Sequence, residues 1–277
     1  MKELKDKVAV ITGAGSGFGR ELAILCAREG MRCVLADIQT DGLQGTEELL
    51  KPLNAQTLSV QCDVSRAESV ANLAEQTYQR FGAAHLLFNN AGVAVAGPTW
   101  TATLEDWKWV LDVNLMGVVH GVHSFVPRML KQDGEAHIVN TASVAGLLSV
   151  PGSSVYCVSK HGVVTLSECL YQDLRMANAR IGVSVLCPAF VKTGIGESAR
   201  NRPAELAASN PLAGPYEERV KQALRAGRLS AADVAHMTME AVKAKRFYII
   251  THPAIKGAIE ARMRDILEEQ LPTNPMP

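Results

Sequence analysis

The sequence predicts a doubly wound α/β domain, in which one parallel sheet of seven strands carries helices on both faces. Three observations support this prediction. Segments rich in Val, Ile and Leu alternate with segments of helical apolar spacing along the 277 residues. The strand segments are near-continuous apolar runs, which is typical of strands covered on both faces. No linker, internal repeat or low-complexity segment divides the chain, so we expect a single domain over residues 1–277.

The first half of the chain contains four of the expected strands, each short and rich in aliphatic residues. They lie at 7–12, 32–37, 57–63 and 84–92. The first three are each followed by a segment with helical spacing. These helices are expected at 19–30, 40–52 and 66–81. The second should break at Pro52, because proline cannot supply the backbone N–H of a helix interior.

The second half continues the alternation and ends with an extra helix. Strands are expected at 136–143, 180–188 and 246–253, and helices at 103–131, 154–177, 230–244 and 254–271. The stretch 190–229 is too long for an ordinary connection. Glycines and prolines interrupt it, so we expect two short helices joined by flexible points. We interpret it as a mobile lid over the ligand; a permanently ordered packing element or part of a subunit interface is the alternative.

The amino-acid composition argues against several classes of binding partner and ligand. Lys and Arg total 28 and Asp and Glu total 28, so no excess charge favours nucleic acid or an anionic membrane. No apolar run reaches the length of a membrane span, and the chain enters a strand directly without a signal segment. The six cysteines are scattered without metal-ligand spacing. We expect a cytoplasmic protein with free thiols and no metal site.

A glycine-rich turn joins the first strand to the first helix. In "VITGAGSGFGREL", Gly13, Gly15, Gly17 and Gly19 let the chain turn tightly and approach a pyrophosphate, which the helix N-terminus attracts. The spacing fits neither G-x-G-x-x-G nor a phosphate-binding P-loop. The turn predicts a Rossmann-type dinucleotide site, and a turn that glycine permits for packing alone is the alternative.

An acidic residue closes the second strand. Asp37 follows Gly17 by twenty residues, where a carboxylate can accept hydrogen bonds from both adenosine ribose hydroxyls of NAD. The same carboxylate would repel the 2′-phosphate of NADP, and no Arg or Lys occupies position 16 or 38. We therefore expect NAD rather than NADP; a solvated Asp at a strand end is the simpler alternative.

The motifs stand in the order of the short-chain dehydrogenase/reductase family, which the sequence resembles over about residues 5–252. They are "TGAGSGFG" (12–19), Asp37, "CDV" (62–64), "NNAG" (89–92), Asn114, Ser143, "YCVSK" (156–160) and "PAFVKT" (188–193). Besides Asp37, the resemblance implies cofactor contacts by Gly13, Ser16, Gly17, Phe18, Gly19, Asp63, Val64, Asn90, Ala91, Gly92, Pro188, Val191 and Thr193. One departure is Ala189, where the family usually has glycine.

The resemblance also gives roles to Tyr156 and Lys160, which lie four positions apart on one face of the expected helix. Alcohol oxidation needs a base for the hydroxyl proton, and tyrosine ordinarily has a pKa of about 10. A nearby lysine cation favours the phenolate. By resemblance, Lys160 also binds the nicotinamide ribose, Ser143 orients the substrate oxygen, and Asn114 holds a water that relays protons. A core tyrosine beside a snorkelling lysine is the plain alternative.

These features together predict an NAD-dependent oxidoreductase acting on apolar secondary alcohols or ketones, aromatic ones included. The segments expected to flank the site are mostly apolar, at 93–98, 144–150 and 190–195. A looser similarity links the chain to the branch containing Cα-dehydrogenases of aryl-ether alcohols. A dinucleotide-binding redox sensor or scaffold is the alternative, but such a protein should lack Ser143, Tyr156 or Lys160. Family members are commonly homodimers or homotetramers.

Overall fold

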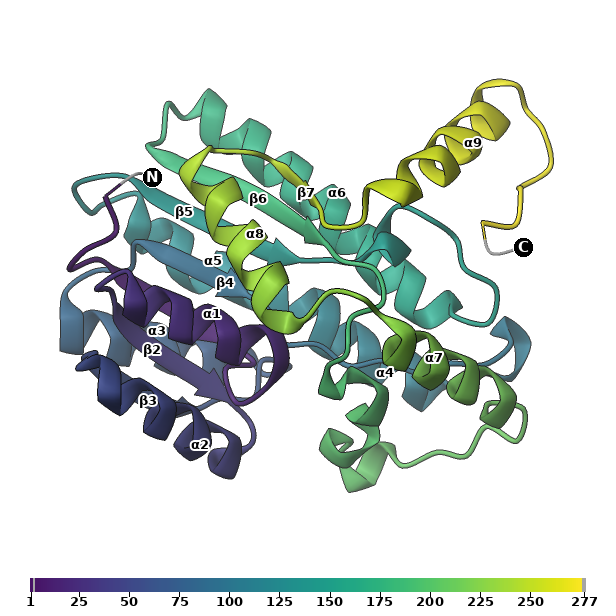
Figure 1. Ribbon diagram of the computed structural model, residues 1–277, viewed down its shortest axis with the longest axis horizontal. Coiled ribbons are helices and arrows are strands. Elements are labelled where there is room, and N and C mark those ends of the chain that lie inside the picture. The colour runs from purple at the N-terminus through teal and green to yellow at the C-terminus, as the bar shows by residue number, and fades with distance from the viewer. Residues whose placement is uncertain (2, 276–277) are drawn as a thin grey trace.

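Seven parallel strands form one sheet in the order β3-β2-β1-β4-β5-β6-β7 (Figure 1). The computed structural model describes residues 1 and 3–275. The strands are β1 (Val8–Thr12), β2 (Arg32–Asp37), β3 (Thr57–Gln61), β4 (Leu86–Asn89), β5 (Ala136–Thr141), β6 (Ile181–Cys187) and β7 (Tyr248–Ile250). The predicted fold class is confirmed. The strand order reverses between β1 and β4, and in sheets of this kind the ligand crevice lies outside the carboxyl ends of the strands at such a switch point.

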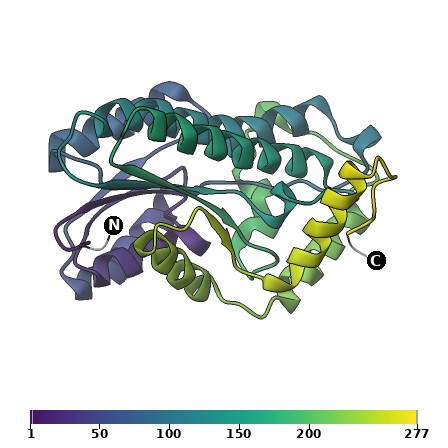
Figure 2. The ribbon, with the colours of Figure 1, turned by 90° about the horizontal axis from the view of Figure 1, so that it is seen from above.

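Helices cover both faces of the sheet, as Figure 2 shows from above. On one face lie α1 (Gly17–Arg28), α2 (Thr40–Leu50) and α8 (Ala231–Lys243). On the other lie α3 (Ala67–Phe81), α4 (Leu104–Leu111), α5 (Gly117–Met129) and α6 (Ser154–Met176). Apolar strand residues such as Phe88 are fully buried between the two layers. This two-sided burial explains why the strands read as continuous apolar runs.

The helix expected over 103–131 is interrupted. A π-helical turn, Asp112–Met116, separates α4 from α5 and turns the buried Asn114 side chain inward. Such turns are frequent at functional sites. By length and composition the combined stretch Leu104–Met129 could cross a membrane, because an 18-residue window within it has a mean hydropathy of 1.2. Its buried residues, such as Val118 and Phe125, pack within the core, so it is weak evidence for a membrane span.

The other departures lie near the C-terminus. The expected lid contains two 3₁₀ helices, Gly194–Asn201 and Ala204–Leu206, before α7 (Gly214–Ala226). The extra helix is shorter than expected: after a 3₁₀ turn, α9 spans Lys256–Leu267, buries none of its residues and projects from the body of the molecule (Figure 1). Further 3₁₀ turns lie at Lys51–Leu53, Thr99–Thr101 and Val144–Gly146.

Candidate active site

The glycine turn after β1 leaves the start of α1 open to an anion. Gly13 and Gly17 adopt φ values of 68° and 51°, which other residues rarely tolerate. At Gly19, a Cβ atom would lie only 2.1 Å from the carbonyl oxygen of Gly13. The Ser16 side chain does not cap α1, and the first turn holds no acidic residue. The N–H groups at this end of the helix are therefore free to bind a phosphate oxygen.

Asp37 is fixed against this turn by two backbone donors. Its Oδ2 atom accepts from the N–H of Gly15 at 2.8 Å, and its Oδ1 atom accepts from the N–H of Gln39 at 2.9 Å. A Cβ atom at Gly15 would lie 2.8 Å from Oδ2, so only glycine allows this approach. The glycine-rich turn predicted Gly15 as part of the approach to the pyrophosphate, but no sequence pattern predicted its contact with Asp37, which lies 22 residues away.

The glycine turn is also held by Arg20 of α1 and Thr46 of α2, neither of which was predicted as a site residue. Arg20 donates through Nε to Thr46 Oγ1 at 3.1 Å and through Nη2 to the carbonyl of Gly15. The Thr46 hydroxyl donates to the carbonyl of Ala14 at 2.8 Å. The brace joins positions 26 residues apart, and no local pattern marks such a contact.

The "NNAG" segment, which begins at the last residue of β4, is tied to the end of β1. Thr12 Oγ1 accepts from the N–H groups of Asn90 and Ala91, at 2.9 Å and 3.1 Å. The Asn90 side chain donates back to the carbonyl of Thr12 at 3.0 Å. These bonds set the shape of the crevice at the switch point, which is where ligands of such sheets bind.

Two other predicted cofactor residues lie after β3. Asp63 Oδ1 accepts from both the N–H and the hydroxyl of Ser65, and the carbonyl of the buried Val64 lies 2.9 Å from Nδ1 of His120. These bonds hold the segment that follows β3 in a defined position.

Tyr156, Lys160 and Ser143 meet beyond the end of β5. The Lys160 ammonium nitrogen lies 5.6 Å from the centre of the Tyr156 ring and donates to the carbonyl of Thr141 at 2.8 Å. Ser143 lies just beyond the end of β5, before the 3₁₀ turn Val144–Gly146, and its hydroxyl accepts from Ala145 N–H at 3.2 Å. The predicted catalytic side chains therefore form one cluster.

Burial dominates the ionisation of this cluster. It raises the pKa of Tyr156 to about 12, although a hydrogen bond with Ser143 acts in the opposite direction. Burial also lowers the pKa of Lys160 to about 8. The nearby lysine cation predicted a lowered pKa for Tyr156 instead. The pKa of Tyr156 is raised rather than lowered because burying a phenolate costs more than the chain's own favourable contacts recover. The positive charge of the nicotinamide ring, which would also favour the phenolate, belongs to the cofactor.

Asn114 lies in the same cluster, but its side chain is committed to the protein. Its Oδ1 atom accepts from Val93 N–H at 2.8 Å, and its amide donates to the carbonyl of Val93 at 2.9 Å and to Ser159 Oγ at 3.0 Å. Both amide hydrogens are used. A water held by Asn114 would therefore bind its main-chain carbonyl more readily than its side chain.

The segment after β6 closes the other side of the site. Val191 is buried, and the Thr193 side chain approaches to 3.4 Å the position that a Cβ of Gly17 would occupy. Pro188 precedes the unusual Ala189, whose N–H donates to Nδ1 of His252 at 3.3 Å. The sequence analysis did not single out His252, which reaches this segment from beyond β7.

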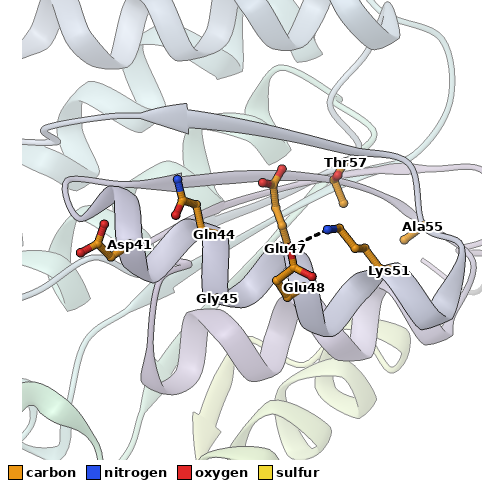
Figure 3. A pocket seen from close by; sticks show the side chains of 8 residues that line it. All are labelled: Asp41, Gln44, Gly45, Glu47, Glu48, Lys51, Ala55 and Thr57. Carbon is orange, nitrogen blue, oxygen red and sulfur yellow. Dashed lines mark hydrogen bonds and ion pairs between the residues drawn. The ribbon is translucent and has the colours of Figure 1, made fainter.

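A separate hollow of about 440 Å³ lies along the outer side of α2 (Figure 3). It is lined by Asp41, Gln44, Gly45, Glu47, Glu48, Lys51, Ala55 and Thr57. Its side chains are mostly polar, and none of the predicted site residues lines it. We therefore place the candidate active site in the crevice at the carboxyl ends of the strands. Within the described residues, no three His, Cys, Asp or Glu side chains are grouped as metal ligands would be.

Comparison with known proteins identifies the family. The short chain dehydrogenase family model matches residues 7–204. A short-chain dehydrogenase/reductase from Burkholderia phymatum, crystallised in complex with NAD, is 48% identical, with a TM-score of 0.98 and 100% of both chains covered.

Two curated relatives match almost the whole chain. The CLA biosynthesis dehydrogenase/reductase of Lactiplantibacillus plantarum is 35% identical over 98% of this chain and 97% of its own length. A C alpha-dehydrogenase from a Sphingobium species is 30% identical over 98% of this chain and 89% of its own length. The chain therefore belongs to the short-chain dehydrogenase/reductase family of oxidoreductases.

Proposed function

We propose that the chain is an NAD-dependent dehydrogenase/ketoreductase that acts on apolar secondary alcohols, aromatic ones included, or their ketones. The observation that carries this proposal is the cluster of Tyr156, Lys160 and Ser143 beside a glycine turn that presents Asp37. The NAD bound to the Burkholderia phymatum relative supports the choice of cofactor.

The cofactor site that we propose runs along the crevice at the switch point. The open N-terminus of α1 and its glycine turn would take the pyrophosphate, and the Asp37 carboxylate would accept from the adenosine ribose. Asp63 and Val64 would bound the adenine, while Asn90, Gly92 and the residues implied after β6 would reach the nicotinamide half. NAD, when bound, supplies the hydride acceptor and a positive ring.

The chain's own residues would move the proton. We propose that the Tyr156 hydroxyl takes the proton of the substrate alcohol, while Ser143 holds the substrate oxygen by a hydrogen bond. Lys160 would favour the phenolate by its charge and bind the nicotinamide ribose. The main-chain carbonyl of Asn114 would hold the water that links Lys160 to solvent. In ketone reduction the same groups would work in reverse, with Tyr156 as the acid.

The walls around this cluster support an apolar substrate. Val93 and Val155 are buried in a small apolar cluster with Trp109, against which Leu206 packs. A pocket of this kind with one polar anchor favours a hydrophobic molecule with a single reacting oxygen. The name of the C alpha-dehydrogenase relative is consistent with an aromatic alcohol.

We expect strong discrimination between the two nicotinamide cofactors. Asp37→Ala should weaken NAD binding about ten- to hundredfold, because hydrogen bonds to a charged group contribute about 1.5–3 kcal/mol. The same change should improve NADP binding, since the repulsion of its 2′-phosphate is lost. Calorimetric titration with both cofactors measures this. Asp41→Ala, four residues further along, is the matched control and should change neither affinity; equal affinities in the wild type would refute the role of Asp37.

We propose that residues 190–229 form a lid, with a buried ion pair as one of its anchors. Arg202 Nη1 binds Asp106 Oδ1 at 2.7 Å, and both side chains are largely buried. Phe190, Val191, Ile195 and Leu206 would cover the substrate and exclude water. Hydrogen exchange should show fast exchange on either side of Arg202 in the free protein and protection with NADH and a substrate analogue. Strong protection without ligands would instead favour a fixed packing element.

We also propose a homodimer or homotetramer. The α4–α5 stretch and α6 carry the exposed apolar residues Leu104, Met116 and Val158, and the resemblance to the family implies that these helices meet a second subunit.

A further inference from the structure

One side-chain hydrogen bond links the lid to the far end of the cofactor crevice. Gln39 Nε2 donates to Asn201 Oδ1 at 2.8 Å, joining residues 162 positions apart. Gln39 lies two residues beyond Asp37, and its own N–H donates to Asp37 Oδ1 at 2.9 Å. The same residue therefore contacts the carboxylate assigned to the adenosine ribose through its backbone and the lid through its side chain.

The lid segment that carries Asn201 contacts the elements around the proposed cofactor site at three points. Its start, at Thr193, lies against Gly17 of the pyrophosphate turn. Its middle is held by Ser198, which is 4% exposed and accepts from Ala94 N–H at 3.2 Å. Its end, at Asn201, reaches Gln39. In Figure 1 this segment, in green, lies beyond the carboxyl ends of the strands.

The adjacent residues Asn201 and Arg202 are held by contacts of unequal strength. Just past Asn201, Arg202 pairs with Asp106 at 2.7 Å, with side chains 14% and 6% exposed. Arg202 also stacks on Trp109, with 5.1 Å between its guanidinium carbon and the ring centre. The bond between Gln39 and Asn201 is solvent-exposed and joins neutral groups. When the segment opens, the bond to Gln39 should therefore break first.

We propose that Gln39 and Asn201 form a clasp that closes the adenosine side of the crevice over bound NAD(H) and slows its release. This inference rests on the proposed function. The clasp would also couple the two ends of the site, because the segment that Asn201 carries continues into the lid over the substrate. Gln39 and Asn201 are then positioning residues that touch neither the reacting atoms nor the catalytic cluster.

Alanine variants test the bond. A neutral hydrogen bond at this exposure predicts a three- to tenfold faster NADH release, corresponding to about 0.6–1.4 kcal/mol. Gln39→Ala and Asn201→Ala should each reach this increase, and the double variant should release NADH no faster than either single one. Stopped-flow fluorescence of NADH, displaced by excess NAD, measures the rate. Gln44→Ala and Asn72→Ala replace exposed residues of the same types outside the crevice and should behave as the wild type.

A second set of variants separates the clasp from general effects of charge. In Asn201→Asp the new carboxylate still accepts from the Gln39 amide. In Gln39→Glu the new carboxylate accepts from the Asn201 amide once that amide has rotated. Each single variant therefore retains one hydrogen bond. The double variant places two carboxylates face to face and no donor between them. Its release rate should exceed the product of the two single effects by at least threefold.

The outcomes distinguish the two proposals. If the wild type fails to bind NADH, the proposed function falls. If the wild type binds NADH but both double variants show only additive effects, the clasp is refuted while the proposed function stands.

Discussion

Tyr156→Phe should abolish turnover and leave the protein able to bind NADH. The substitution removes only the phenolic oxygen, so the proton carrier is lost while the glycine turn and Asp37 are untouched. General acid–base catalysis contributes about 10²–10⁴-fold, and we expect kcat to fall by about that factor. The affinity for NADH should change less than about threefold. Steady-state rates and a fluorescence titration of NADH check both halves of the expectation.

The pH profile of the wild type provides an independent readout of the same residue. Burial holds the pKa of Tyr156 at about 12 in the free protein, so the phenolate is disfavoured until the cofactor's positive charge arrives. The rate of alcohol oxidation with saturating NAD should therefore rise with pH through a value well below 12. If Tyr156→Phe kept appreciable activity at neutral pH, or if the profile rose only near pH 12, Tyr156 would not be the base.

Lys160→Met should remove activity and yet stabilise the fold. The ammonium is 2% exposed, and burial lowers its pKa from 10.5 to about 8. At about 1.36 kcal/mol per unit, holding the charge costs up to about 3 kcal/mol of folding free energy. Methionine removes this cost but also removes the hydrogen bond to the Thr141 carbonyl, so the net gain in folding free energy is smaller than the full burial cost. We expect turnover to fall at least about a hundredfold and NADH to bind more weakly.

The sign of the stability change can be checked by pH. Because the pKa of Lys160 is lower in the folded protein, the cost is fully present below pH 8 and disappears as the pH rises towards 10.5. Urea unfolding should show Lys160→Met as more stable at pH 7 and the difference as smaller at pH 10. Lys131→Met, at an exposed lysine, should show no such dependence. A less stable Lys160→Met at pH 7 would mean that the ammonium is held by interactions stronger than its burial penalty.

The fold could be predicted because its signals are local and repeated. Apolar strands, helical spacing and the turn after β1 each fix one element, and the alternation of elements fixes the parallel sheet. The elements that were predicted less well depend on tertiary contacts. The π-helical turn at 112–116 accompanies the bonds of Asn114 to Val93, and α9 ends at Leu267 although its sequence pattern continues.

The candidate site was predictable only where a motif marks it. Tyr156, Lys160 and Ser143 were identified from the sequence and lie together in the structure. The contacts of Gly15, Thr46 and His252 were not predicted, because each joins residues that are distant in sequence. The pKa of Tyr156 also differed from expectation, since burial is a property of the folded chain that spacing does not reveal. The roles that we propose for Tyr156 and Lys160 in turnover are tested by Tyr156→Phe and Lys160→Met.

The most direct test of the central claim is transfer of deuterium from a labelled secondary alcohol to NAD. A panel that includes 1-phenylethanol and cyclohexanol, each deuterated at the carbinol carbon, is incubated with the protein and NAD. Mass spectrometry then measures the deuterium in the reduced cofactor and the ketone formed. We predict one deuterium in each NADH and an equal amount of ketone with the wild type, and neither with Tyr156→Phe. Binding of NAD without transfer from any alcohol, and without reduction of the matching ketones by NADH, would contradict the account.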